Sequence, residues 1–166
     1  LEAVWKHFSD LRAVAQCLPG ATLNEVGDDT FSGWVEVRFG LISAKFEGEG
    51  KYHLDNEKRR GELTGQGKDK GGQSNVTGSM AYQVSVDRAL GKSLVGVTFR
   101  FRIEGVLAQF NRPELVTGFV DFLLAQFIAN CDAVLSGGTV RAGGVSAFAV
   151  GKTVLLGLLR NLFKRN

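Results

Sequence analysis

Alternating apolar and polar residues predict an antiparallel sheet through the middle of the chain. Thr30–Phe39 and Ile42–Leu54 alternate with a period of two, as strands do when one face is buried and the other meets water. Only Gly40-Leu41 separates these two runs, which predicts a hairpin. Three further runs keep the pattern, with inward positions at Leu63, Gly65 and Gly67, then at Val76, Gly78, Met80, Tyr82, Val84 and Val86, and finally at Val95, Val97, Phe99, Phe101 and Ile103.

A single long helix is expected after the last strand, from Pro113 to about Leu135. Proline suits the first helical position, and Ser136-Gly137-Gly138 ends the helix. Apolar residues recur along this segment at spacings of three and four, at Val116, Phe119, Val120, Leu123, Phe127, Cys131 and Val134. Such a stripe needs a large apolar partner, so the helix is predicted to lie across the apolar face of the sheet.

Two short helices are predicted before the strands, at Glu2–Ser9 and Asp10–Cys17. The second ends at Leu18-Pro19-Gly20, because proline cannot continue a helix. The expected fold class is therefore α+β, with a curved antiparallel sheet wrapped around a long C-terminal helix and two short helices at the N-terminus.

The predicted inward side chains argue against catalysis beneath the helix. Across five strands they include no Asp, Glu, His, Arg, Lys, Ser or Thr, and their only polar atoms are the hydroxyls of Tyr52 and Tyr82. A general acid–base or nucleophilic site needs titratable groups, so no catalytic residue is expected there. The same face is rich in glycine, at Gly33, Gly48, Gly50, Gly65, Gly67 and Gly78. These glycines either permit strong sheet curvature or leave volume for an apolar ligand, and the two interpretations are compatible.

Composition indicates one ordinary globular domain, since 166 residues with 44% hydrophobic content can bury a core without disulfides or metal. The two cysteines, Cys17 and Cys131, are interpreted as reduced, buried thiols of a cytoplasmic protein. His7 and His53 have no partner at metal-ligand spacing, and each is expected to be a surface or an internally satisfied histidine. No metal site is predicted. The chain opens without a signal-type apolar run, so secretion is not expected.

Charge is distributed unevenly along the chain. Residues 1–136 hold 15 Lys and Arg against all 17 Asp and Glu, a net charge of −2, whereas the remaining residues carry +5. The high isoelectric point therefore reflects a basic tail and does not indicate nucleic-acid binding by the domain.

The tail divides into a glycine-rich linker, 137–145, and an amphipathic helix, 146–166, that follows a folded domain of residues 1–136. The helical segment is at the short limit for a membrane span and is interrupted by charges and glycines, which favours a helix lying on the membrane surface. The residues predicted to contact an anionic membrane are Phe148, Lys152, Leu155, Leu156, Leu159, Arg160, Leu162, Phe163, Lys164 and Arg165. The alternative is a helix that folds back on its own domain or on a partner protein.

Several motifs resemble those of a known family. They are Val4-Trp5 with Phe8-Ser9-Asp10, Cys17-Leu18-Pro19-Gly20-Ala21, the series Gly33-x-Val35-x-Val37-x-x-Gly40-x-x-Ser43-Ala44-x-Phe46-x-Gly48, Gly65-x-Gly67-x-Asp69, Gly105-Val106-Leu107-Ala108-Gln109-Phe110 and Phe127. The element order resembles the helix-grip superfamily of START-like and polyketide-cyclase-like proteins. The motifs resemble, within it, the carbon monoxide dehydrogenase accessory proteins of the CoxG family, up to about Leu135.

This resemblance implies a small, non-catalytic accessory protein that works with the molybdenum-containing carbon monoxide dehydrogenase. It also implies a part in placing that enzyme at the cytoplasmic membrane. Together with the reduced cysteines and the tail helix, this predicts a cytoplasmic protein held peripherally on the inner face of the cell membrane. The sequence departs from the family in beginning at the first helix, where the family usually has a preceding strand.

The functional hypothesis is a carrier of a lipophilic ligand, a respiratory quinone such as menaquinone, bound without covalent attachment. The resemblance implies an enzyme whose electrons must reach an acceptor confined to lipid. The apolar face of the predicted sheet could bind that acceptor. The predicted ligand-binding residues are Val37, Phe39, Phe46, Gly48, Tyr52, Gly78, Met80, Tyr82, Val97, Phe99, Phe119, Leu123 and Phe127. The alternatives are a helix-grip enzyme, a cyclase or hydrolase of an apolar substrate, and a membrane tether without a ligand.

Overall fold

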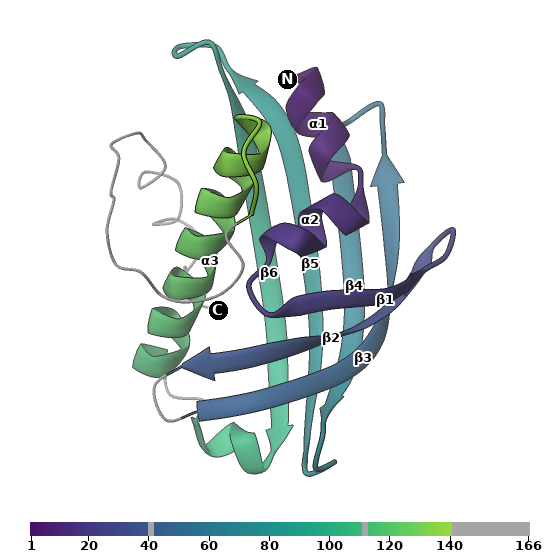
Figure 1. Cartoon of the computed structure of the whole chain (residues 1–166), viewed down its shortest axis with the longest axis vertical. Coiled ribbons are helices and arrows are strands. Elements are labelled where there is room, and N and C mark those ends of the chain that lie inside the picture. Colours follow the sequence, from purple (N-terminus) through teal and green to yellow (C-terminus); the bar gives the residue numbers. More distant parts are fainter. Residues whose placement is uncertain (40–41, 111–112, 141–166) are drawn as a thin grey trace.

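One six-stranded antiparallel sheet and the helices on one of its faces make up the fold (Figure 1). The computed structural model describes residues 1–39, 42–110 and 113–140, with the backbone alone at 37–39, 42, 110, 113–116 and 119. In chain order the elements are α1 (Glu2–Phe8), α2 (Leu11–Cys17), β1 (Ala21–Val26), β2 (Thr30–Phe39), β3 (Ile42–Asp55), β4 (Arg60–Asp69), β5 (Ser74–Asp87), β6 (Lys92–Gly105), the 3-10 helix η1 (Val106–Phe110) and α3 (Pro113–Leu135). Each strand pairs with its neighbours in the chain, so the predicted α+β meander is confirmed.

The helices have the predicted bounds to within one residue, and local chemistry accounts for their ends. The carboxylate of Asp10 caps α2, because its Oδ1 accepts from the backbone N–H groups of Arg12 at 2.9 Å and Ala13 at 3.2 Å. After α3, Gly137 adopts φ +81°, its N–H donates to Val134 O at 3.0 Å, and the N–H of Gly138 donates to Ala133 O at 2.8 Å. This is a Schellman ending, which needs a residue that tolerates the left-handed region, as glycine does.

Strand β1 was not among the predicted strands. It pairs with β2, but the register shifts between Leu23 and Glu25. A bulge of this kind breaks the alternation of inward and outward side chains, and alternation is the signal from which strands are predicted.

Gly48, at the centre of β3, permits the close approach of β3 and β4. A Cβ atom at this position would lie 2.1 Å from Gln66 O and 2.8 Å from Gly67 Cα, both of them backbone atoms of β4. Glycine is therefore needed at this position because the backbone of the neighbouring strand approaches it closely.

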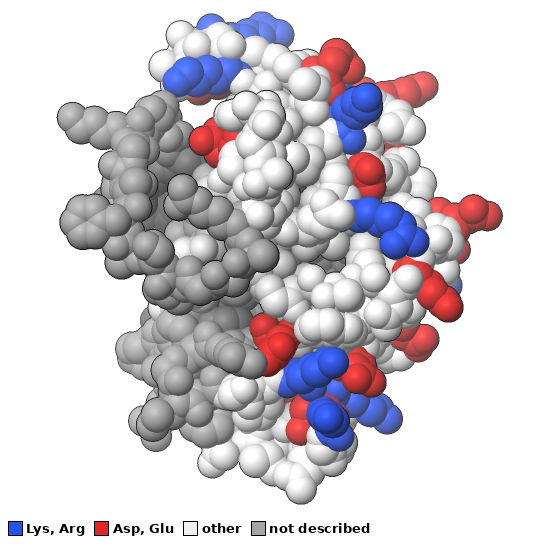
Figure 2. All heavy atoms as spheres, viewed as in Figure 1, with Lys and Arg blue, Asp and Glu red and all other residues white. Residues whose placement is uncertain are grey.

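The helices cover the sheet unevenly. Helices α1 and α2 lie over the upper part of the sheet in Figure 1, and α3 runs beside β6 with its C-terminal end near α1. Helix α3 packs against α2 and α1. In the same view the Lys, Arg, Asp and Glu side chains gather mainly along the margin formed by β1, β3 and β4, and few lie on the part of the helix-bearing face that the grey atoms leave visible (Figure 2).

Candidate functional site

The inner face of the sheet, which faces the helices, is closed at the end covered by α1 and α2. A core of buried side chains fills this end, which we call the closed half: Trp5, Phe8, Val14, Cys17, Tyr82, Val84 and Cys131. Val4, Leu54, Leu63, Met80, Val95, Val97, Phe127, Val134 and Val140 pack against it. The closed half is thus an ordinary packed core that joins α1, α2 and the C-terminal part of α3 to the sheet.

The opposite end of the inner face is less well covered. We call it the open half and define it by Phe46, Gly48, Gly78, Phe99 and Phe101. Phe46 is buried, but the side chain of Phe99 remains 55% exposed although it lies on the apolar side of β6. Its ring stacks on that of Phe101, with centroids 5.5 Å apart and planes inclined by 29°. Phe101 itself is half-buried. An aromatic pair that solvent reaches on an apolar face is a surface that an apolar ligand can cover.

Aromatic rings occupy part of the space that the inward glycines leave. The Phe31 ring lies over Gly50, because its Cζ would be 2.4 Å from a Cβ added there. The same ring atom would be 3.8 Å from a Cβ added at Gly65. The Tyr82 ring covers Gly61 in the same way. Gly78 differs, because the nearest atoms to an added Cβ are Arg100 O at 3.3 Å and, at about 4 Å, the Phe101 and Phe99 side chains. Ring atoms therefore fill the space beside Gly50 and Gly61, whereas the side chains near Gly78 are only in ordinary contact range.

Apart from Tyr52, which is described below, the predicted ligand-binding residues fall into four groups. Tyr82, Met80, Val97 and Phe127 belong to the closed half or pack against it, while Phe46, Gly48, Gly78 and Phe99 lie in the open half. Leu123 is half-buried on α3, between the two. The side chains of Val37, Phe39 and Phe119 lie outside the described residues.

Both tyrosine hydroxyls of the predicted site donate to backbone carbonyls. Tyr82 donates to Phe8 O at 2.6 Å and Tyr52 donates to Gly27 O at 2.9 Å, in the turn between β1 and β2. Burial raises the pKa of Tyr82 to about 12, so its proton stays in place at neutral pH. Each hydroxyl has a single proton to donate. A ligand carbonyl could therefore accept a hydrogen bond from Tyr82 or Tyr52 only if that tyrosine gave up its bond to the backbone carbonyl.

Polar groups do occur on the inner face, at its lower end in Figure 1, where none was predicted. Asp69 and Ser74 continue the inward alternation of β4 and β5, and Ser74 is 1% exposed. Asp69 Oδ1 accepts from the Ser74 N–H at 2.7 Å, and Ser74 Oγ accepts from the Leu107 N–H at 3.0 Å. Both side chains thereby hold the β4–β5 turn and η1, beside a hollow of about 300 Å³ that they help to line. The prediction of an inner face without Asp or Ser is wrong at this end.

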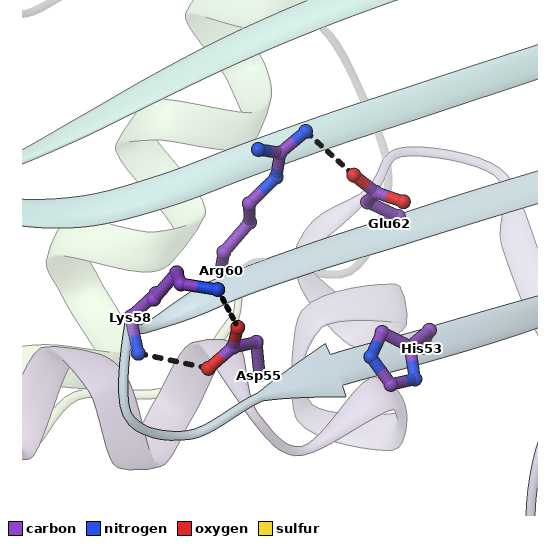
Figure 3. A pocket seen from close by; sticks show the side chains of 5 residues that line it. All are labelled: His53, Asp55, Lys58, Arg60 and Glu62. Atoms are coloured by element: carbon purple, nitrogen blue, oxygen red, sulfur yellow. Dashed lines mark hydrogen bonds and ion pairs between the residues drawn. The ribbon is translucent and has the colours of Figure 1, made fainter.

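A second hollow, of about 170 Å³, lies on the outer face of the sheet and is lined by charged side chains (Figure 3). Lys58 binds Asp55 through its backbone N–H at 2.9 Å and its Nζ at 3.1 Å, and the backbone bond is the main reason that the pKa of Asp55 is lowered. Arg60 pairs with Glu62 at 2.5 Å. His53 lies in the same hollow and is exposed. Alternating charges in ion pairs are typical of a solvated strand surface, and they present no carboxylate poised as a base.

A buried cluster of His7, Cys17 and Cys131 was not predicted. It joins α1, α2 and α3, and Cys17 Sγ lies 3.6 Å from His7 Nε2. Burial raises the pKa of both thiols and lowers that of the imidazole, with Asp10 opposing the last effect, so all three groups are neutral at pH 7. Both cysteines are free, as expected. Their proximity is invisible in the sequence because 114 residues separate them.

Comparison with known proteins identifies the family. The sequence profile of CoxG, described as a subunit of carbon monoxide dehydrogenase, matches residues 1–136. The chain belongs to this family. A search of curated protein sequences finds no match to it. Among solved structures, a conserved protein from Geobacillus kaustophilus is similar with a TM-score of 0.70 and 14% sequence identity, over 82% of this chain and 88% of that one. At this identity the likeness shows a shared fold.

Membership of the CoxG family makes this chain a carbon monoxide dehydrogenase-associated protein, in keeping with an accessory role. The match ends where the predicted domain ends, so the tail lies beyond it. The residues predicted to bind the membrane, Phe148 to Arg165, lie outside the described residues. Among the helices that the structure does describe, none is long and apolar enough to cross a lipid bilayer.

Proposed function

We propose that this member of the CoxG family is a non-catalytic carrier of a lipophilic ligand, a respiratory quinone such as menaquinone, which lies against the open half. The observation that carries the proposal is Phe99, a large aromatic side chain on the inner face of the sheet that remains 55% exposed. Phe99 and Phe101 would stack on the ring or cover the isoprenoid tail, and the open face at Gly78 would admit it.

The family association supports this choice of ligand. A soluble dehydrogenase must pass its electrons to an acceptor that is confined to lipid, and a carrier beside the enzyme bridges that gap. The enzyme alternative lacks support, because the carboxylate found on the described part of the inner face, Asp69, is engaged by the Ser74 N–H. The tether alternative predicts no ligand, and binding measurements distinguish it from the carrier.

The test is binding of menaquinone to the reduced, full-length protein, followed by quenching of tryptophan fluorescence or by extraction and chromatography. We expect saturable binding that Phe99→Ala weakens about tenfold or more, because covering a Phe side chain contributes about 1.5–3 kcal/mol. Trp34→Ala is the matched control. Trp34 lies on the outer face beneath Lys45, whose Nζ is 4.0 Å from the ring centroid, so its loss should leave the affinity unchanged.

Two results would contradict the carrier. A wild-type protein that neither binds added menaquinone nor yields quinone on organic extraction would leave the tether as the better account. Equal weakening by Phe99→Ala and Trp34→Ala would instead place the ligand elsewhere or mark the binding as non-specific.

Docking on the membrane is proposed from the tail sequence. Each basic residue near an anionic surface contributes about 1 kcal/mol, and Lys152, Arg160, Lys164 and Arg165 are available in addition to the apolar face of the expected helix. Truncation after Gly144 should abolish cosedimentation with anionic vesicles and leave the circular dichroism of the domain in place. Unchanged cosedimentation of the truncated protein would exclude the tail as the anchor.

A further inference from the structure

Three soft metal-ligand side chains converge in the closed half, one from each α-helix. The ligand atoms of His7, Cys17 and Cys131 all lie within 4.8 Å of one another. The residues are 9%, 0% and 7% exposed, respectively. Figure 1 shows α1, α2 and the C-terminal end of α3 meeting at the upper end of the molecule. We propose that this cluster is a binding site for a thiophilic divalent cation, Zn²⁺, which fastens the three helices to one another.

The separation of the Cys17 thiol from the His7 imidazole suits such an ion. Zinc binds thiolate at about 2.3 Å and imidazole at about 2.0–2.1 Å with tetrahedral angles, which puts the two ligand atoms about 3.5 Å apart. Cys17 Sγ and His7 Nε2 are 3.6 Å apart. That distance alone would also suit a hydrogen bond between thiol and imidazole. The thiol of Cys131 favours a metal site over a simple hydrogen bond, because it brings a third ligand to the same point from a segment 114 residues away.

The chemistry of the donors selects the ion. Thiolate and imidazole favour Zn²⁺ over Mg²⁺ or Ca²⁺, which take oxygen ligands. Two thiolates balance the charge of one divalent cation, so the site is neutral overall, as a buried site should be. On binding, two Zn–S bonds replace two S–H bonds, the two protons pass to solvent, and the imidazole binds through Nε2 while it keeps its proton on Nδ1. No electrons are transferred, and one tetrahedral position remains for a water molecule.

Neighbouring contacts hold the ligands in place without the ion. Asn130, next to Cys131 in α3, donates from Nδ2 to Cys17 O at 3.0 Å and so ties the end of α2 to α3. The Phe8 ring packs edge-on against the His7 imidazole, with centroids 5.5 Å apart. These contacts fix α2 against α3 and hold the His7 ring in place.

The experiment is titration of the reduced, full-length protein with Co²⁺ and then Zn²⁺. We expect one equivalent of Co²⁺ to give the thiolate-to-cobalt charge-transfer absorption and the visible bands of a tetrahedral site, and Zn²⁺ to displace it. Cys131→Ser and His7→Gln should each weaken Co²⁺ binding about tenfold or more. His53→Gln, on the exposed outer face, is the control and should bind as the wild type does.

The wild-type spectrum tests the proposal even if a variant fails to fold, and circular dichroism identifies such a variant. Absence of the charge-transfer band in folded, reduced wild-type protein would overturn the site. So would bands that persist at full strength in folded Cys131→Ser. A Cys17–Cys131 disulfide found by mass spectrometry in protein taken from cells under alkylating conditions would also overturn it, by assigning the two thiols to redox chemistry.

Discussion

Replacement of Gly48 by alanine should destabilise the domain by about 3 kcal/mol or more. The new Cβ would lie 2.1 Å from Gln66 O and 2.8 Å from Gly67 Cα, and backbone atoms in the middle of a sheet cannot move aside as the end of a side chain can. Overpacking a core typically costs about 1–3 kcal/mol, and a clash with backbone belongs at the upper end or beyond. Urea unfolding followed by circular dichroism gives the change.

Gly96→Ala is the matched control for this substitution. Gly96 also lies within a strand, β6, but an added Cβ there would meet nothing within 4 Å. Alanine loses less backbone entropy than glycine on folding, so this variant should be unchanged or more stable by roughly 0.5–1 kcal/mol. If the two variants proved equally stable, the backbones of β3 and β4 would not approach each other this closely.

Phe8→Ala should cost about 3–5 kcal/mol, the usual range for removing a buried Phe. Phe8 contacts both the sheet and α3, since its ring centroid is 5.7 Å from that of Tyr82 and 6.3 Å from that of Phe127. A domain of this size has about 5–15 kcal/mol of stability, so the variant should be partly unfolded at elevated temperature. Thermal and urea unfolding measure the loss.

Phe99→Ala provides the contrast, because it deletes the same side chain from the open half. With 55% of the residue already exposed, the stability cost should be about 1 kcal/mol or less. The two variants thus separate the two ends of the inner face: one is expected to lose stability and the other to lose ligand. A larger stability cost at Phe99 than at Phe8 would reverse the assignment of closed and open halves.

Local periodicity carried most of the fold prediction. The runs around Phe31, Phe46, Met80 and Val97 alternate without interruption, and they form β2, β3, β5 and β6. Helix α3 has both its bounds marked by residues with special backbone preferences, Pro113 at the start and Gly137 after the end. Where alternation fails, at the bulge between Leu23 and Glu25, the prediction failed with it.

The candidate site was harder to predict, because its features depend on how distant segments pack. Glycine positions alone could not distinguish Gly50, over which the Phe31 ring lies, from Gly78, where the face stays open. The alternation of polar and apolar residues also could not show that the Ser74 hydroxyl would accept a hydrogen bond from the Leu107 N–H of η1. The meeting of Cys17 with Cys131 required the packing of α3 on α2, for which a single sequence contains no local signal.

The bond from Asn130 to Cys17 closes a loop of 113 residues that contains the whole sheet. By contrast, every strand pairing in the sheet joins neighbours along the chain across a short turn. In an unfolded chain, closing a loop of this length costs about 4 kcal/mol of entropy, more than closing a hairpin turn does. The formed sheet already holds most of this loop in place, so docking α3 onto it costs much less. All five strand pairings would survive a release of α3, because none of them involves that helix. A departure of α3 from the intact sheet would therefore expose the inner face without unfolding it.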